Sequence, residues 1–298
     1  MGKKIRIIGV PMDFGQHHRG VDMGPAALRY SGLASELRGL GYEVEDSGDV
    51  LVPVRDQGPD TEPGPKNYVS EITRVCQRVY DAGKQAIKEN YIPLFLGGDH
   101  SIAMGTVGGV SHDGPTGLIW MDAHGDFNTS ETSPSGNVHG MPLAALIGEG
   151  ESSLVNMGRN GAKVDPDQVV LMGIRDLDTK ERNRLKQSGI TVYTMRDIDE
   201  QGISAVTHKA LMKFVHMKNI HISVDMDVMD PAEAPGVGTP VPGGLTYREA
   251  HLFMEIIADS HKLASMDIVE INPILDQANR TARLAVDLTV SALGKRIY

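Results

Sequence analysis

Two kinds of segment alternate along this 298-residue chain. Short apolar runs, which are typical of buried strands, are separated by stretches in which apolar residues recur every three or four positions, as in amphipathic helices. The predicted strands are residues 5–10, 42–46, 92–96, 117–121, 169–174, 191–194, 221–224 and 264–269. The predicted helices are residues 25–40, 67–89, 179–188, 203–215, 247–261 and 283–293.

This alternation predicts an α/β fold: a single doubly wound domain over residues 1–298, with a mostly parallel, roughly eight-stranded sheet and helices on both faces. No segment of the sequence has the composition of a linker. Eight strands can also close into a barrel, so the pattern alone leaves that architecture open. In an open sheet, ligands gather outside the carboxyl ends of the strands.

Ligand-type side chains stand at the ends of three of the apolar runs. In extended chain, side chains at positions i and i+2 point to the same side, roughly 6.5–7 Å apart, so such a run can present a row of ligands at the mouth of a strand. The residues are Asp99 and His100 after the first run, Asp122, His124 and Asp126 after the second, and Asp225 and Asp227 after the third. Two loops rich in glycine and proline, 128–142 and 231–244, follow two of these rows and are expected to wall a site.

One pair of aspartates after a strand is commonly a turn or a helix cap. Carboxylates at the ends of three strands are harder to explain as turns or caps. So many unpaired carboxylates would repel one another and raise each other's pKa values. The economical interpretation is a pair of divalent metal ions. Carboxylates with a minority of imidazoles favour a hard ion such as Mn²⁺ over Zn²⁺. Four aspartates balance two such ions, and a bridging hydroxide leaves a slightly negative site that suits a cationic substrate.

The motifs and their order resemble those of the ureohydrolase family, and within it those of the arginases. The similar segments are IIGVPMDFGQHHRGVDMGP, GGDHS, DAHGDFN, SGNVHGMP, GIRDLD, VDMDVMDP, GTPVPGGLTYREA and DIVEINP, which together span nearly the whole chain. The resemblance implies an open sheet instead of a barrel. It also implies a binuclear manganese hydrolase that converts L-arginine and water to L-ornithine and urea, with a metal-bridging hydroxide attacking the guanidinium carbon.

The resemblance also implies the residue roles. Two Mn²⁺ ions per subunit would be held by His100, Asp122, His124, Asp126, Asp225 and Asp227, with the division between the two ions left open. Asp99 is expected to be structural. His139 would carry protons, Asp126 would accept a hydrogen bond from the nucleophile, and Glu270 would bind the guanidinium group. The residues expected to contact substrate are His124, Asn128, Ser135, Asn137, Asp178, Thr239 and Glu270.

Other functions remain as alternatives. An agmatinase, a formiminoglutamase or another amidinohydrolase would use the same metal site on a different substrate. A non-catalytic relative is less favoured, because a degenerate site has no physical reason to keep His139 and Glu270. A zinc deacetylase of related architecture fits less well, since carboxylates outnumber imidazoles among the ligands.

Composition and charge narrow the range of binding partners and cellular locations that we expect for the protein. A formal net charge of −10 argues against a nucleic-acid partner, because binding phosphates needs a basic face. No apolar stretch approaches the roughly 18 residues of a membrane span, and the apolar part of MGKKIRIIGVP is too short for a signal peptide. The only cysteine, Cys76, lies on the apolar stripe of helix 67–89 and is expected in the core. We therefore expect a cytoplasmic enzyme that acts on a small-molecule substrate. The resemblance implies that it forms a homo-oligomer, either a trimer or a hexamer.

Overall fold

One eight-stranded sheet forms the centre of the computed structural model, which describes residues 4–55 and 68–296. The strands are β1 (Lys4–Val10), β2 (Glu43–Asp49), β3 (Tyr91–Gly97), β4 (Gly117–Met121), β5 (Val169–Ile174), β6 (Thr191–Thr194), β7 (Ile220–Asp225) and β8 (Leu263–Val269). They lie in the order β2-β1-β3-β8-β7-β4-β5-β6, and every neighbouring pair is parallel. Strands β2 and β6 are edges, so the sheet is open. The predicted α/β fold is confirmed, and the barrel is excluded.

Both faces of the inner strands are buried, which explains why these strands are continuous apolar runs. In β4, Ile119 and Met121 belong to one hydrophobic cluster, whereas Leu118 and Trp120 belong to another on the opposite face. Successive side chains of a strand point to opposite faces, so each run supplies both cores at once. All four side chains are at most 1% exposed.

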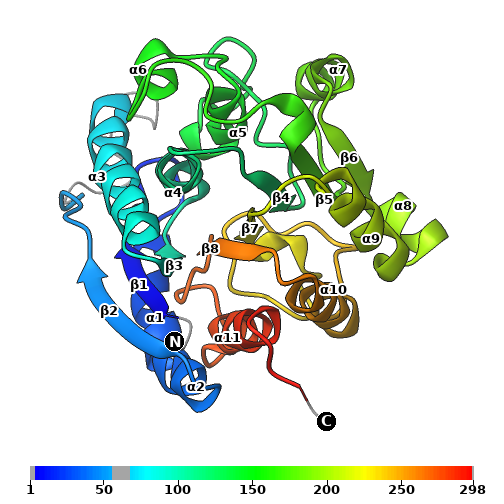
Figure 1. Cartoon of the computed structure of the whole chain (residues 1–298). Helices are drawn as coiled ribbons and strands as arrows, with labels where there is room; N and C mark the ends of the chain where they lie inside the picture. The colour runs from blue at the N-terminus through cyan, green and yellow to red at the C-terminus, as the bar shows by residue number, and fades with distance from the viewer. Residues whose placement is uncertain (1–3, 56–67, 297–298) are drawn as a thin grey trace.

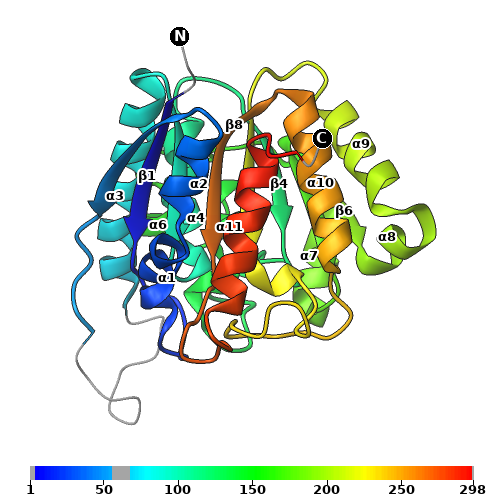
Figure 2. The ribbon, with the colours of Figure 1, turned by 90° about the horizontal axis from the view of Figure 1, so that it is seen from below.

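Helices cover each face, as Figure 1 shows. One layer contains α1 (Gly24–Tyr30), α2 (Leu33–Gly39), α8 (Met195–Gln201), α9 (Ile203–Lys213), α10 (Tyr247–Ser260) and α11 (Arg280–Ala292). The other contains α3 (Val69–Lys88), α4 (Ala103–Val110), α5 (Pro142–Leu146), α6 (Ser152–Val155) and α7 (Thr179–Ser188). In Figure 2, helices α1, α2, α11 and α10 lie in front of the sheet.

Each predicted helix corresponds to helical structure, with one division. The predicted helix 25–40 is two helices, because Gly32 takes a φ of +85° that ends one helix and precedes the next. The predicted start of helix 67–89, Asn67, lies outside the described residues. Cys76 on α3 is 0% exposed, which confirms its place in the core. Among the described residues, no helix has both the length and the apolar content needed to cross a membrane.

Candidate active site

Four adjacent strands at the middle of the sheet end in the candidate site. In sheet order these are β3, β8, β7 and β4, which lead into His100, Glu270, Asp225 and Asp122 respectively. Neighbouring strands lie only about 4.8 Å apart, so side chains at their carboxyl ends can contact one another. The convergence predicted from three separate stretches of sequence is therefore produced by the strand order.

The chain after β3 turns sharply to present His100. Asp99 Oδ1 accepts a hydrogen bond from Ser101 N at 3.0 Å, which caps the short 3₁₀ helix η3 (His100–Ile102), and its Oδ2 accepts one from Gly15 N at 2.8 Å. Both carboxylate oxygens of Asp99 are thus used in holding the loop, as expected for a structural residue. Gly98 permits a close approach here, because a Cβ on it would lie 1.9 Å from the carbonyl oxygen of Met12.

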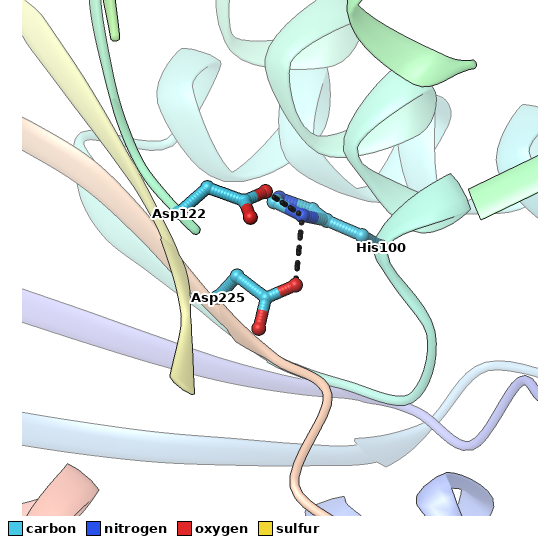
Figure 3. Close-up of side chains that lie close together, drawn as sticks. All are labelled: His100, Asp122 and Asp225. Carbon is cyan, nitrogen blue, oxygen red and sulfur yellow. Dashed lines mark ion pairs between the residues drawn. The ribbon is translucent and has the colours of Figure 1, made fainter. Parts of the chain in front are cut away.

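His100 faces three carboxylates, two of which are drawn in Figure 3. Its Nδ1 lies 3.2 Å from Asp122 Oδ2, 3.0 Å from Asp126 Oδ2 and 3.3 Å from Asp225 Oδ2. His124 Nδ1 occupies an equivalent place on the other side of Asp122, at 3.4 Å from Asp122 Oδ1. The cluster has the form of two triads that share Asp122.

The second triad consists of Asp122, His124 and Asp227, and each triad has ligand atoms within 4.8 Å of one another. His124 Nδ1 lies 3.0 Å from Asp227 Oδ2. Asp227 Oδ2 also accepts a hydrogen bond from Thr239 Oγ1 at 3.0 Å, and its Oδ1 accepts one from Ala123 N at 3.1 Å. These hydrogen bonds hold the carboxylate in position next to His124.

The donor set fits divalent cations. His100 Nδ1 and Asp126 Oδ2 are buried and have no hydrogen-bond partner, although only 3.0 Å separates them. Ligands about 2.1 Å from a common octahedral ion, and at right angles, lie about 3 Å apart. Two buried polar atoms at this spacing are costly to leave unsatisfied and are well placed to bind one ion.

Electrostatics in the cluster also favour a cation. Burial raises the pKa of Asp126 to about 6. Burial, together with the charges of Asp227 and Asp122, raises the pKa of Asp225 well above its ordinary value. Burial opposes the charged form of His100, but the carboxylates of Asp122, Asp126 and Asp225 around Nδ1 outweigh this and raise the pKa of His100. Without metal the cluster therefore retains protons, which metal binding would release.

Trp120 packs against two members of the cluster, His100 and Asp122. Its indole ring stacks on the His100 imidazole, with ring centroids 4.1 Å apart and an interplanar angle of 16°. Its Nε1 donates a hydrogen bond to Asp122 Oδ2 at 2.9 Å. Trp120 is 0% exposed, so it is a core residue that also fixes two members of the cluster.

His139 and Glu270 form a pair beside the cluster. His139 Nδ1 lies 2.9 Å from Glu270 Oε1, and Glu270 also accepts hydrogen bonds from Gln16 Nε2 at 2.7 Å and from the His100 backbone N–H at 2.9 Å. Burial lowers the pKa of His139, but the Glu270 carboxylate outweighs it and raises that pKa to about 9. Glu270, a predicted substrate-contact residue, is 0% exposed and is not among the residues that line the cavity beside His139.

A cavity of about 300 Å³ opens above the cluster, with Asp126 and Asp225 in its lining. Loop 128–142 supplies much of the wall and loop 231–244 supplies Thr239, so both predicted wall loops are in place. Asn128 Nδ2 donates a hydrogen bond to Asp178 Oδ2 at 2.7 Å, which joins loop 128–142 to the N-terminal end of α7. The other predicted substrate-contact residues that line the cavity are His124, Ser135 and Asn137, and the predicted proton carrier His139 also lines it.

Two acidic residues of the lining, Asp176 and Glu181, were not predicted. Asp176 and Asp178 stand at alternate positions just after β5, which is the same signal that identified the metal-ligand candidates. Glu181 lies in the first turn of α7, and its Oε1 accepts a hydrogen bond from Phe127 N at 2.9 Å. The spacing of residues after β5 could have indicated Asp176, whereas Glu181 required the helix to be placed against the cavity.

Comparisons with known proteins agree on one family. The model of the arginase family matches residues 3–294. The arginase of Bacillus subtilis (strain 168) is 48% identical over 301 residues, covering 100% of each chain. The solved structure of the arginase from Bacillus caldovelox is 45% identical, with a TM-score of 0.95 over 99% of this chain and 100% of that one. The formimidoylglutamase of Bacillus subtilis is similar at 25% identity, with a TM-score of 0.79 over 98% of this chain and 86% of that chain.

Proposed function

Because the chain belongs to the arginase family of hydrolases, we propose that it hydrolyses L-arginine to L-ornithine and urea at a binuclear manganese centre. One observation carries the proposal: buried imidazole and carboxylate atoms without hydrogen-bond partners lie at the base of a polar cavity of about 300 Å³. The relatives named arginase are 45% and 48% identical, against 25% for the formimidoylglutamase, and this favours arginine over other amidine substrates.

The proposed ligands are His100, Asp122, His124, Asp126, Asp225 and Asp227. When bound, two Mn²⁺ ions would lower the pKa of a shared water, so that hydroxide is available near neutral pH to attack the guanidinium carbon. Asp126 also lines the cavity, so its carboxylate is placed to accept a hydrogen bond from that nucleophile.

The cavity offers groups for both ends of the amino acid. Asn128, Ser135 and Asn137 supply amide and hydroxyl donors, which can bind an α-carboxylate without adding a positive charge that would repel the guanidinium group. Asp178, with a pKa kept below its ordinary value by hydrogen bonds despite partial burial, can accept hydrogen bonds from the α-amino group. The acidic lining as a whole suits a cation.

His139 is placed to move the proton that the reaction requires. Addition of hydroxide to the guanidinium carbon and cleavage of its bond to the side-chain nitrogen give urea and the ornithine amine, and this amine needs a proton to leave. His139 lines the cavity, and Glu270 stabilises its protonated form through the 2.9 Å contact at Nδ1. Glu270 thereby holds the imidazole in one orientation; a direct contact between Glu270 and the guanidinium group stays a prediction.

Metal removal and substrate choice test the proposal together. The chelated protein should release no urea, and added Mn²⁺ should restore release better than Zn²⁺. For the restored enzyme, kcat/KM for arginine should exceed that for agmatine by about 10³-fold or more, because loss of the α-carboxylate leaves polar groups of the site unpaired. Comparable use of both substrates would reduce the assignment to an amidinohydrolase of unspecified substrate.

A single substitution sharpens the test of specificity. Asp178→Ala should weaken arginine use while leaving the metal content intact, whereas Asp167→Ala, at an exposed aspartate of the 3₁₀ helix η5 (Pro166–Gln168), should change neither. If Asp178→Ala leaves kcat/KM for arginine unchanged, Asp178 does not contact the substrate.

The assembly and location stay predictions. A trimer or hexamer is expected from family resemblance, and light scattering of the purified protein would measure it directly. Cytoplasmic location, likewise, is a prediction from the sequence that cell fractionation would test.

A further inference from the structure

A chain of buried polar side chains runs away from the candidate site into the protein interior. His100 Nε2 lies 2.8 Å from Ser223 Oγ, and Ser223 Oγ donates a hydrogen bond to Asp267 Oδ1 at 2.6 Å. Asp267 Oδ2 lies 2.9 Å from His221 Nε2 and also accepts a hydrogen bond from Thr106 Oγ1 on α4. All five side chains are 0% exposed, so no bulk water screens or replaces these contacts.

The hydrogen bonds along this chain have a defined direction. An ionised carboxylate only accepts hydrogen bonds, and a serine hydroxyl has one proton to give. Since Ser223 gives its proton to Asp267, Ser223 can only accept from His100 Nε2. His100 must then carry a proton on Nε2, so Nδ1, which faces Asp122 and its neighbours, is the ring nitrogen left to bind a metal ion, with release of any proton that it holds.

Asp267 keeps its charge in this dry setting because donors surround it. Burial opposes ionisation of Asp267, but the His221 side chain and the Ser223 hydroxyl outweigh burial and lower the pKa of the carboxyl. His221 is held in turn by Ser265, whose Oγ lies 2.7 Å from His221 Nδ1. The orientation of the chain therefore originates at Asp267, two hydrogen bonds away from His100.

We propose that Asp267 is a positioning residue for the metal centre, and that it acts through Ser223 to hold His100 in the tautomer whose Nδ1 can bind a cation. The inference rests on the proposed metal centre. A histidine ligand is commonly fixed by a carboxylate or carbonyl that accepts the proton of its other ring nitrogen. Here the carboxylate is one serine further away, on β8, and neither Asp267 nor its partner His221 belongs to a sequence pattern of ligands.

Asp267→Asn is the informative substitution, because it keeps the size of the side chain and removes the charge. Two donors, from His221 and Thr106, face the Oδ2 position, so they favour the amide oxygen there and turn the amide NH₂ toward Ser223. Ser223 would then accept from the amide and donate to His100 Nε2. This reversal places the His100 proton on Nδ1, where it competes with a metal ion.

Calorimetric titration of the metal-free protein with Mn²⁺, without substrate, measures the effect. Wild type should bind two ions, and Asp267→Asn should bind one of them about 10- to 100-fold more weakly while the ion beside His124 changes much less. Ser223→Ala breaks the same chain without touching Asp267, and should weaken the same ion. If the Asp267→Asn variant does not fold, the Mn²⁺ affinity of Ser223→Ala tests the positioning role in its place.

A matched control separates positioning from general stability. Ser291→Ala removes another buried hydrogen bond to a histidine, the 2.9 Å contact with His251 between α10 and α11, and should lower the melting temperature without changing Mn²⁺ affinity. Unchanged Mn²⁺ affinity in Asp267→Asn, with a melting shift like that of the control, would overturn the positioning role alone. A wild-type protein that binds no Mn²⁺ would overturn the metal centre and this inference together.

Discussion

Two carboxylate residues of the candidate site adopt backbone conformations that side chains rarely take. Asp126 has a φ of 49° and Glu270 a φ of 64°, both in the left-handed region. A non-glycine residue there costs on the order of 1 kcal/mol, and such strain persists only where the surroundings enforce it. For Glu270 the surroundings are the hydrogen bonds from Gln16, His100 and His139. Glycine would relieve the strain at either position but would remove the carboxylate.

Replacement of His139 should separate proton transfer from metal binding. His139 contacts Glu270 and does not belong to either triad, so His139→Gln should keep both metal ions and lower kcat by about 10- to 10⁴-fold. Metal analysis and steady-state kinetics measure the two effects. His112→Gln, at a histidine that contacts Tyr80 outside the cavity, should leave kcat unchanged. Loss of metal from the His139 variant would show that its role is misassigned.

Glu181 should make stability depend on pH in a particular direction. Burial raises its pKa to about 8, so the folded state holds the proton more tightly than the unfolded chain does, where the ordinary value is 4.5. Its favourable contribution is full below about pH 4.5 and is lost as pH rises to about 8. In metal-free protein, Glu181→Gln should therefore gain stability over wild type across this range, by a few kcal/mol in total, as measured by urea unfolding. A difference independent of pH would contradict the raised pKa.

At the residue scale, the sequence was informative where ligands repeat along one strand end. Asp122, His124 and Asp126 stand at alternate positions after an apolar run, and all three belong to the cluster. The chain there is not extended strand as the spacing implied, because β4 ends at Met121 and Asp126 has a φ of 49°. Ser223 and Asp267 are single polar residues within apolar runs, and no spacing in the sequence indicates that they contact each other or His100. Their connection depends on β7 lying next to β8.

At the scale of elements, the six inner strands were predicted within one residue at each end because two buried faces produce continuous apolar runs. The exposed edge strand β2 was predicted to end at residue 46 but runs to Asp49. Helix α4 was missed for a related reason. Every residue of AMGTVGGV is buried, so the segment has no polar face and shows no helical stripe. Its glycines also lower helix propensity, and here they permit close packing: a Cβ on Gly105 would lie 2.5 Å from the carbonyl oxygen of Cys76 on α3.

The turn after β3 should be intolerant of any added side chain. In Gly98→Ala the new methyl group would lie 1.9 Å from the carbonyl oxygen of Met12, so the backbone must move. We expect a loss of about 1–3 kcal/mol of stability, as for overpacking, together with weaker Mn²⁺ binding because His100 follows directly. Gly39→Ala, in α2 with nothing near its Cβ position, should be neutral or slightly stabilising. Unfolding curves and Mn²⁺ titrations of both variants check this, and equal stability of the two would refute the steric argument.

At the scale of the molecule, the order of the strands could not be read from their sequences. The apolar runs show that a strand is buried on two faces but do not identify its neighbours. The open sheet was inferred from family resemblance, since eight strands alone also allow a barrel. The strand order in turn decides which ligands meet, because β3 and β4 are separated in the sheet by β8 and β7.

Metal should contribute to the stability of the whole protein. The metal-free cluster holds carboxylates whose burial disfavours their charge, and two cations would relieve this. A ligand that binds only the folded state adds about 2.7 kcal/mol when its free concentration is 100-fold above its Kd. The melting temperature should therefore rise when Mn²⁺ is added to chelated protein, and should rise much less in Asp225→Asn. An equal melting temperature with and without Mn²⁺ would mean that the cluster binds no metal in the folded state.

The position of β8 in the sheet determines at which stage of chain synthesis the candidate site can form. It is the last strand of the described chain, yet it lies between β3 and β7, so without it the sheet is two separate pieces. His100 belongs to the piece β2-β1-β3, whereas Asp122 and Asp225 belong to the piece β7-β4-β5-β6. A chain still emerging from the ribosome cannot bring the two together until residues 263–269 have been translated. A nascent or truncated protein therefore has no completed ligand cluster with which to take up a metal ion.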